Sequence, residues 1–145
     1  GAGMTANETA RLTAAEVAAF LDEVFPQSTG KFVIEEVAHG HARVRMPVDE
    51  SHLRPGDTIS GPSMFWLADC AFYVAVLCSI GPEAQAVTTN LSINFLRRPR
   101  MVDLVGEARI TKLGRRLASG DVLIAPAEGG APVAQALVTY ALPTG

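Results

Sequence analysis

The segment from Ser63 to Ile80 is the strongest constraint on how this chain can fold, because its eighteen residues carry a single formal charge. That charge is the carboxylate of Asp69. An ionised carboxylate in apolar surroundings is costly unless it is paired, hydrogen-bonded or used in a reaction. Asp69 is therefore a candidate functional residue. The alternatives are a structural ion pair with an arginine or a position on a solvated stripe of the helix.

The same segment predicts a helix buried in a protein core. Ser60 is a suitable N-cap, Pro62 suits the first helical turn, and Gly81 ends the helix. An apolar run of this length is also long enough to be considered as a membrane span. The internal charge, and the lack of a cationic residue nearer than Arg54 and Arg97, argue against a span, so we expect no membrane partner.

Length and composition describe one soluble domain over residues 1–145. The chain is 48% apolar and 19% charged, without low-complexity runs or repeats. We expect residues 1–10 to be flexible and residues 1–3 to be an expression scar, and we see no signal peptide. Cys70 and Cys78 are eight residues apart, about 12 Å along a helix, which is too far for a disulfide. Free thiols fit a reducing compartment, so we expect a cytoplasmic protein.

The remaining patterns predict a helix, two strands, the long helix and then four strands. Thr13 and Glu16 have the spacing of a capping box and open a short amphipathic helix that ends before Pro26. Strands at 32–37 and 42–46 form a hairpin, and a loop follows at 49–60. The last four strands are predicted at 86–96, 102–112, 117–125 and 132–141.

This order of elements suggests how the long helix is covered. A helix that is apolar on nearly all sides must be wrapped, and a strongly curved antiparallel sheet of about six strands can wrap it. Ala68, Ala71 and Ala75 recur at helical spacing, which would let strands approach closely. The predicted class is α+β, in the hotdog fold: a long central helix in a curved antiparallel sheet, with a short N-terminal helix.

Two stretches resemble the hotdog acyl-CoA thioesterases of the phenylacetate-pathway, or PaaI-like, type: GDTISGPSMFWLADCAFYVAVLCSIG and VTTNLSINFLRRP. The matching pieces are the helix start at 60–62, the Leu-Ala-Asp triplet at 67–69 and the strand end at 95–99. The resemblance implies hydrolysis of acyl-CoA thioesters to a free carboxylic acid and coenzyme A. It implies no metal or cofactor, because coenzyme A enters only as part of the substrate.

The resemblance also assigns roles around the start of the helix. Asp69 would attack the thioester carbonyl or activate a water that does so, and both routes remain open. Gly61 would polarise the carbonyl through its backbone N–H, since unpaired amides at a helix start suit a developing oxyanion. Ser60 is the third catalytic candidate, although many relatives have His there and some have Asn in place of Arg54. Ser60 serving only as a helix cap is the alternative.

The strand that begins at residue 87 is predicted to have one polar face. One face carries Thr88, Asn90, Ser92 and Asn94, and the other carries Val87, Thr89, Leu91, Ile93 and Phe95. Relatives often have a Ser or Thr here that holds the attacking water, so Thr88 is the fourth catalytic candidate, with Thr89 as the alternative. Asn90 is a candidate for substrate binding. Ordinary strand contacts are the alternative for each.

Basic residues are concentrated in one stretch. Seven of the twelve Lys and Arg residues lie between 97 and 116, opposed only by Asp103 and Glu107. This excess suits the phosphates of coenzyme A, and a solvated strand face is the alternative. The substrate-binding candidates are Arg97, Arg98, Arg115 and Arg116, with Phe65 as a wall of the acyl pocket. A net charge of −3 without a recognition motif argues against nucleic acid.

The spacing of Gly61 and Asp69 predicts a site shared between two chains. Eight residues correspond to about 12 Å along a helix, so one carbonyl cannot contact both within one chain. A two-fold dimer that brings each helix start beside the partner's Asp69 removes this difficulty, and the family builds its sites in this way. We therefore predict an obligate homodimer, alone or as a dimer of dimers.

Other functions have to be weighed against hydrolysis. A non-catalytic acyl-CoA binding module is the main alternative, because a fold alone does not determine function. A hydratase would need an Asp and His pair before the long helix, and Asp57 and His52 lie there without that family's spacing. His39, His41 and His52 lack a Cys or acidic grouping at metal-ligand spacing, so no metal is predicted.

Overall fold

The computed structural model describes residues 9–143 of the chain. The expected scar at 1–3 lies outside these residues, as does the expected flexible start apart from residues 9 and 10. Two single turns of 3-10 helix are labelled η1 and η2. In chain order the elements are α1 (Ala14–Val24), η1 (Pro26–Ser28), β1 (Val33–Ala38), β2 (His41–Met46), η2 (Glu50–His52), β3 (Leu53–Arg54), β4 (Thr58–Ile59), α2 (Gly61–Ile80), β5 (Val87–Phe95), β6 (Leu104–Leu113), β7 (Leu117–Pro126) and β8 (Ala134–Ala141).

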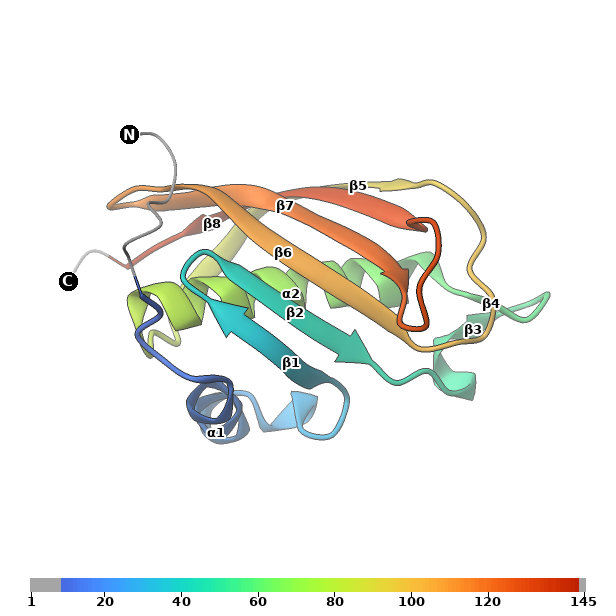
Figure 1. The fold of residues 1–145 in the computed structure, drawn as a ribbon, viewed down its shortest axis with the longest axis horizontal. Helices are drawn as coiled ribbons and strands as arrows, with labels where there is room; N and C mark the ends of the chain where they lie inside the picture. The colour runs from blue at the N-terminus through green and yellow to red at the C-terminus, as the bar shows by residue number, and fades with distance from the viewer. Residues whose placement is uncertain (1–8, 144–145) are drawn as a thin grey trace.

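Six strands form one antiparallel sheet with α2 running along one face (Figure 1). Their order across the sheet is β1-β2-β6-β7-β8-β5, so β1 and β5 are the two edges. α1 packs beside β1 and α2, at the β1 side of the sheet. This arrangement confirms the predicted α+β class and the hotdog fold.

The short first helix begins as its sequence predicts. The Glu16 amide donates to the Thr13 hydroxyl at 3.1 Å, and the Thr13 amide donates to the Glu16 carboxylate at 3.0 Å. This reciprocal pair is a capping box, which satisfies two amides that a helix start would otherwise leave unpaired. Val17 and Leu21 are buried in the core, so the predicted apolar stripe faces inward.

The long helix α2 is a core helix. By length and composition alone it could cross a membrane, but 67% of that apolar window is buried inside the protein. Its first turn is capped by the Ser60 hydroxyl, which accepts from the Ser63 amide at 3.3 Å. Gly81, with a φ of 103°, ends it in a conformation that favours glycine. The predicted bounds of this helix are confirmed.

The helix and the sheet approach each other closely. Ala68, Ala71 and Ala75 are fully buried, as their spacing predicts. On β7, a Cβ added to Gly120 would lie 2.0 Å from the Arg109 carbonyl oxygen and 2.9 Å from a ring carbon of Phe72. Because no real Cβ tolerates such contacts, only glycine fits at position 120.

The structure adds a small hairpin that the sequence does not predict. β3 and β4 pair with each other inside the segment expected to be a loop, with Leu53 opposite Ile59. Each strand has only two residues, too few for an alternating pattern to be recognised. The turn between them contains Asp57, the one non-glycine residue among those described with a positive φ, at 56°.

A β-bulge in β5 corrects the predicted faces of that strand. Thr88 is paired with Tyr140 and Asn90 with Thr139, so Thr89 is an extra residue that the strand register skips, although its hydroxyl donates to the Thr139 carbonyl at 3.2 Å. Tyr140 belongs to the side of β8 that faces α2, and Thr88 is therefore turned toward the helix. Asn90 remains on the opposite face and is exposed. The strict alternation that grouped Thr88 with Asn90 was wrong.

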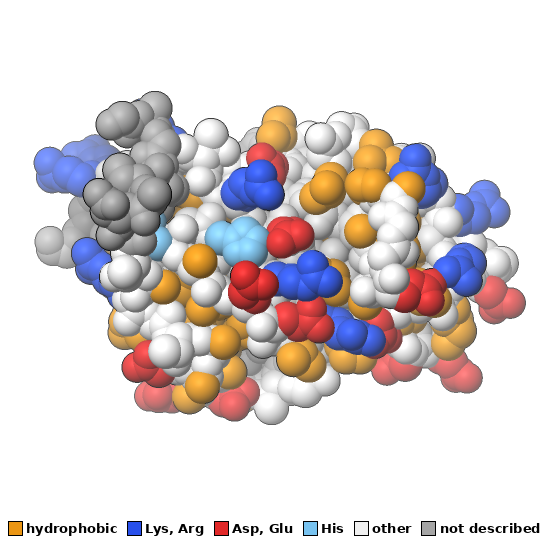
Figure 2. Space-filling view, in the orientation of Figure 1, with side chains coloured by type: hydrophobic (Ala, Val, Ile, Leu, Met, Phe, Trp, Pro, Cys, Tyr) orange, Lys and Arg blue, Asp and Glu red, His pale blue; other side chains and the backbone are white. Residues whose placement is uncertain are grey.

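The outer face of the sheet carries a band of charged side chains (Figure 2). Asp103 accepts from Arg45 at 2.8 Å, and Glu107 lies 3.0 Å from the His41 ring nitrogen. Exposed pairs of this kind contribute about 0–1 kcal/mol each to stability. They do, however, engage the two acids that the sequence sets against the basic stretch at 97–116.

Candidate active site

Asp69 lies on the side of α2 that faces β5 and β8, where two hydroxyl groups bind it. The Thr88 hydroxyl donates to the Asp69 Oδ1 atom at 2.6 Å. The Tyr140 hydroxyl lies 2.7 Å from the same Oδ1 and 3.1 Å from the Asp69 carbonyl oxygen. Asp69 forms no ion pair with any residue in 9–143. A structural ion pair with an arginine of this chain segment, one of the alternatives to a functional role, is therefore excluded.

Tyr140 is the site residue that the sequence analysis missed. It is buried, and its ring stacks on Tyr73 with centroids 5.9 Å apart and packs against Phe72 at 5.4 Å. Burial, and then the negative charge of Asp69, raise the pKa of Tyr140 above its ordinary value. The phenol therefore keeps its proton and can donate a hydrogen bond. The available signal was a tyrosine on the buried, alternating face of the last strand, since a buried tyrosine hydroxyl needs a partner.

The neighbouring Cys70 is not a competing nucleophile. Burial, and then the charge of Asp69, raise the pKa of the Cys70 thiol above its ordinary value. A cysteine reacts as its thiolate, which this environment disfavours. Asp69 therefore remains the candidate reactive group at this point of the helix.

Gly61 begins α2 in a different hollow, of about 360 Å³. The first amides of a helix have no partner within the helix, so the Gly61 N–H is available to a ligand. Arg54, Arg97 and Arg98 line the same hollow, as does the Phe95 ring, which lies 3.1 Å from where a Gly61 Cβ would be. The hollow therefore combines a backbone hydrogen-bond donor, the Gly61 N–H, with three arginine side chains.

The Asp69 hollow, of about 330 Å³, is separate from the Gly61 hollow within one chain. Thr88, Tyr73 and Tyr140 line it together with Asp69, and Gly61 does not. Phe65 lies on α2 midway between Gly61 and Asp69 and is 42% exposed. An apolar ring between the two hollows can contact an acyl group or another chain.

The structure brings only some of the basic candidates together. Arg97 and Arg98 follow the end of β5 and lie near Gly61. Arg115 and Arg116 lie in the turn before β7. The first residue of β7 pairs with Ala141 of β8, and Ala141 also pairs with Val87 at the start of β5. The two pairs of arginines are therefore at opposite ends of β5 in one chain.

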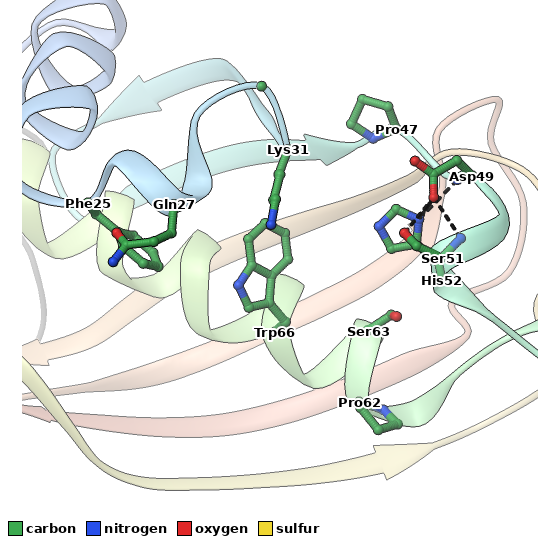
Figure 3. Close-up of a pocket in the computed structure, with 11 residues that line it drawn as sticks. Phe25, Gln27, Lys31, Pro47, Asp49, Ser51, His52, Pro62, Ser63 and Trp66 are labelled. Atoms are coloured by element: carbon green, nitrogen blue, oxygen red, sulfur yellow. Dashed lines mark hydrogen bonds and ion pairs between the residues drawn. The ribbon is translucent and has the colours of Figure 1, made fainter.

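A third hollow, of about 470 Å³, contains neither Asp69 nor Gly61 (Figure 3). Trp66 and Lys31 project into it from opposite sides, and Ser63 lines the start of α2. His52 also lines it and accepts a hydrogen bond from the Asp49 amide at 3.0 Å. Within the same residues no group of three or more His, Cys, Asp or Glu side chains is placed to hold a metal ion.

Comparison with known proteins extends this description. Residues 56–133 match the family model of the thioesterase superfamily. A proposed thioesterase from Silicibacter sp. TM1040 is 49% identical, with a TM-score of 0.85 over 92% of this chain and 94% of that one. Two solved structures at 24% identity share the fold. They are the E. coli PaaI protein of the phenylacetic acid degradation operon (TM-score 0.79, covering 91% of this chain and 94% of that one) and zebra fish thioesterase superfamily member 2 (0.80, 91% and 99%).

Proposed function

The chain belongs to the thioesterase superfamily, and on that premise we propose that it hydrolyses acyl-CoA thioesters to free carboxylic acids and coenzyme A. The observation that carries the proposal is Asp69, the only charge of an apolar core helix. Two neutral hydroxyls bind its Oδ1 atom, while Oδ2 has no hydrogen-bond partner within residues 9–143. A carboxylate that is held in place but not neutralised can act as a nucleophile or a general base.

The Gly61 N–H and the Asp69 carboxylate would have different roles in the reaction. The Gly61 N–H would bind the thioester carbonyl oxygen, where negative charge develops as the tetrahedral intermediate forms. Asp69 would either add to the carbonyl carbon, giving a mixed anhydride that water then cleaves, or take a proton from a water that adds instead. In the first route the C–S bond breaks as the anhydride forms, coenzyme A leaves as a thiolate that takes a proton from solvent, and the later addition of water releases the acid and restores the Asp69 carboxylate. In the second route Asp69 passes the proton that it took from water to the departing sulfur as the C–S bond breaks. Both routes consume one water and give the free thiol, and the acid loses its own proton to solvent.

The coenzyme A part of the substrate is supported by the charges beside Gly61. Arg54, Arg97 and Arg98 line the hollow that contains Gly61. Within residues 9–143 none of these three arginines forms an ion pair with an acid, so their charges are not neutralised there. Phosphate groups are suitable ligands for such a cluster.

We further propose that the site is completed by a second copy of the chain. β5 is an edge strand, and Val87 and Phe95 on it are 54% and 53% exposed. Such an edge can pair with another strand. Thr88 contacts Asp69, and Phe95 contacts Gly61, at opposite ends of this strand. Antiparallel pairing of two β5 edges about a two-fold axis at mid-strand would therefore bring each Asp69 toward the partner's Gly61.

Subunit complementation tests this shared site. One chain carries Asp69→Asn and the other Gly61→Pro, with different tags, and heterodimers are purified through both tags. Each heterodimer keeps one intact site, so we expect about half of wild-type turnover, although each homodimer has little. Purified heterodimers that are as inactive as both homodimers would contradict a site shared between chains.

Thiol release from acyl-CoAs tests the function itself. A panel of short, medium, long and aromatic acyl-CoAs is incubated with the protein, and free thiol is measured over time. We expect turnover of at least one class, since acyl chain length and shape are selected by the pocket wall. Binding of acyl-CoA without any turnover across the panel would instead favour the non-catalytic binding module.

A further inference from the structure

We infer that Tyr140 is a positioning residue that holds the carboxylate of Asp69 so that only its Oδ2 atom acts on the thioester. The inference rests on the proposed function, because it concerns the same carboxylate. It adds a residue that lies on the last strand, outside the motif segments of the long helix and β5, and it says which carboxylate oxygen is chemically active.

Two hydroxyl donors converge on one oxygen of Asp69. Thr88 and Tyr140 lie 2.6 and 2.7 Å from Oδ1, distances typical of strong hydrogen bonds to a charged oxygen. The Tyr140 hydroxyl is also 3.1 Å from the Asp69 carbonyl oxygen, which ties it to the helix backbone as well as to the side chain. Rotation of the carboxylate would break the contacts to Oδ1, so Oδ2 stays on the unbound side.

Tyr140 is packed too closely to follow a moving carboxylate. Its side chain is 3% exposed, with Tyr73 stacked on one side and Phe72 packed against it. The pKa of the phenol is raised by burial and by the adjacent charge, so the phenol remains a donor. A donor fixed by packing can fix its acceptor, which is how preorganised sites are supported.

The bulge in β5 determines which threonine binds Asp69. Without the extra residue at Thr89, the alternation of the strand would turn Thr88 away from the helix. The bulge therefore selects Thr88, opposite Tyr140 in the β5–β8 register, as the second donor to Oδ1. Two strands and one helix thus converge on a single oxygen atom.

The test compares Tyr140→Phe with Thr139→Val. Both changes remove one hydroxyl from β8, but the Thr139 hydroxyl lies 3.3 Å from the Ser119 hydroxyl, on the face of the strand opposite Tyr140, and does not contact Asp69. For Tyr140→Phe we expect kcat to fall roughly ten- to a hundredfold with KM changed by less than about twofold, because small misplacements of a reacting group are costly. For Thr139→Val we expect kcat to stay within about twofold of wild type.

Thr88 provides an independent check on the same oxygen. Thr88→Val removes the donor and is expected to lower kcat, whereas Thr88→Ser keeps a hydroxyl and is expected to restore most of it. Combining Tyr140→Phe with Thr88→Val should lower kcat by less than the product of the single effects, since the loss of either hydroxyl already frees the same carboxylate to rotate.

Thermal unfolding of every variant separates positioning from folding. A Tyr140→Phe protein that unfolds at the wild-type temperature, has the wild-type KM and has lost kcat supports the inference. A Tyr140→Phe protein with the kcat of Thr139→Val overturns it, as does a loss of kcat that is matched by a loss of folded protein. Wild-type protein without turnover on any acyl-CoA would overturn the proposed function itself, a result that the variants cannot mimic.

Discussion

Replacing Asp69 with Asn is expected to lower the rate of thiol release by about 10²–10⁴-fold while leaving the protein folded. The amide has nearly the same shape, and its oxygen can still accept from Thr88 and Tyr140, so the two hydroxyls keep their partner. It cannot add to a carbonyl as a carboxylate does or take a proton from water. The loss should therefore appear in kcat rather than in KM.

The measurement pairs turnover with binding in the same protein. Trp66 is the only tryptophan of the chain and lies in the first turns of α2, so its fluorescence is expected to report acyl-CoA binding near the helix start. Unchanged binding with lost turnover would identify Asp69 as a catalytic residue. An Asp69→Asn protein that retains most of its turnover would refute that role, whatever its affinity.

Replacing Gly61 with Pro is expected to lower kcat by about 10²–10³-fold, the loss that follows removal of one oxyanion donor. Proline is favoured at the first position of a helix, where no intrahelical hydrogen bond is lost. Ser60, the residue before it, has φ −70° and ψ 151°, a conformation that a following proline accepts. The change therefore removes the N–H while preserving the helix start.

Gly61→Ala is the matched control for the added carbon. Its Cβ would lie 3.1 Å from the ring of Phe95, which is exposed and can shift by a few tenths of an ångström. The alanine variant keeps the N–H, so we expect it to retain far more turnover than the proline variant. Equal losses in the two variants would mean that space, and not the amide donor, matters at this position.

Local signals predicted most of the fold. The capping box at Thr13 and Glu16, the proline-led start of α2 and the alternating strands are all patterns within a few residues, and the structure has each of them. The curved sheet followed because an almost wholly apolar helix must be covered on every side. Asp69 was recognisable for the same reason, as the single charge in that helix.

The contacts around Asp69 depended on pairing that no local pattern records. Thr88 and Thr89 are identical in type, and only the register of β5 against β8 decides which of them faces the helix. Tyr140 is 71 residues from Asp69 in the chain, so their contact is a product of the whole sheet order. The shared site and coenzyme A binding stay predictions. The separation of the Asp69 and Gly61 hollows supports the shared site, and the arginines beside Gly61 support coenzyme A binding.

The absence of a side chain at Gly120 links the close packing of helix and sheet to the position of the Asp69 carboxylate. A methyl group there would collide with the backbone of β6 and press on Phe72, which packs against Tyr140, which in turn binds Asp69. A substitution at position 120 of β7 would thus displace the carboxylate through two aromatic rings, Phe72 and Tyr140. We therefore expect inactivating mutations away from the substrate as well, at positions such as Gly120 and Phe72 that lie between the helix and the sheet.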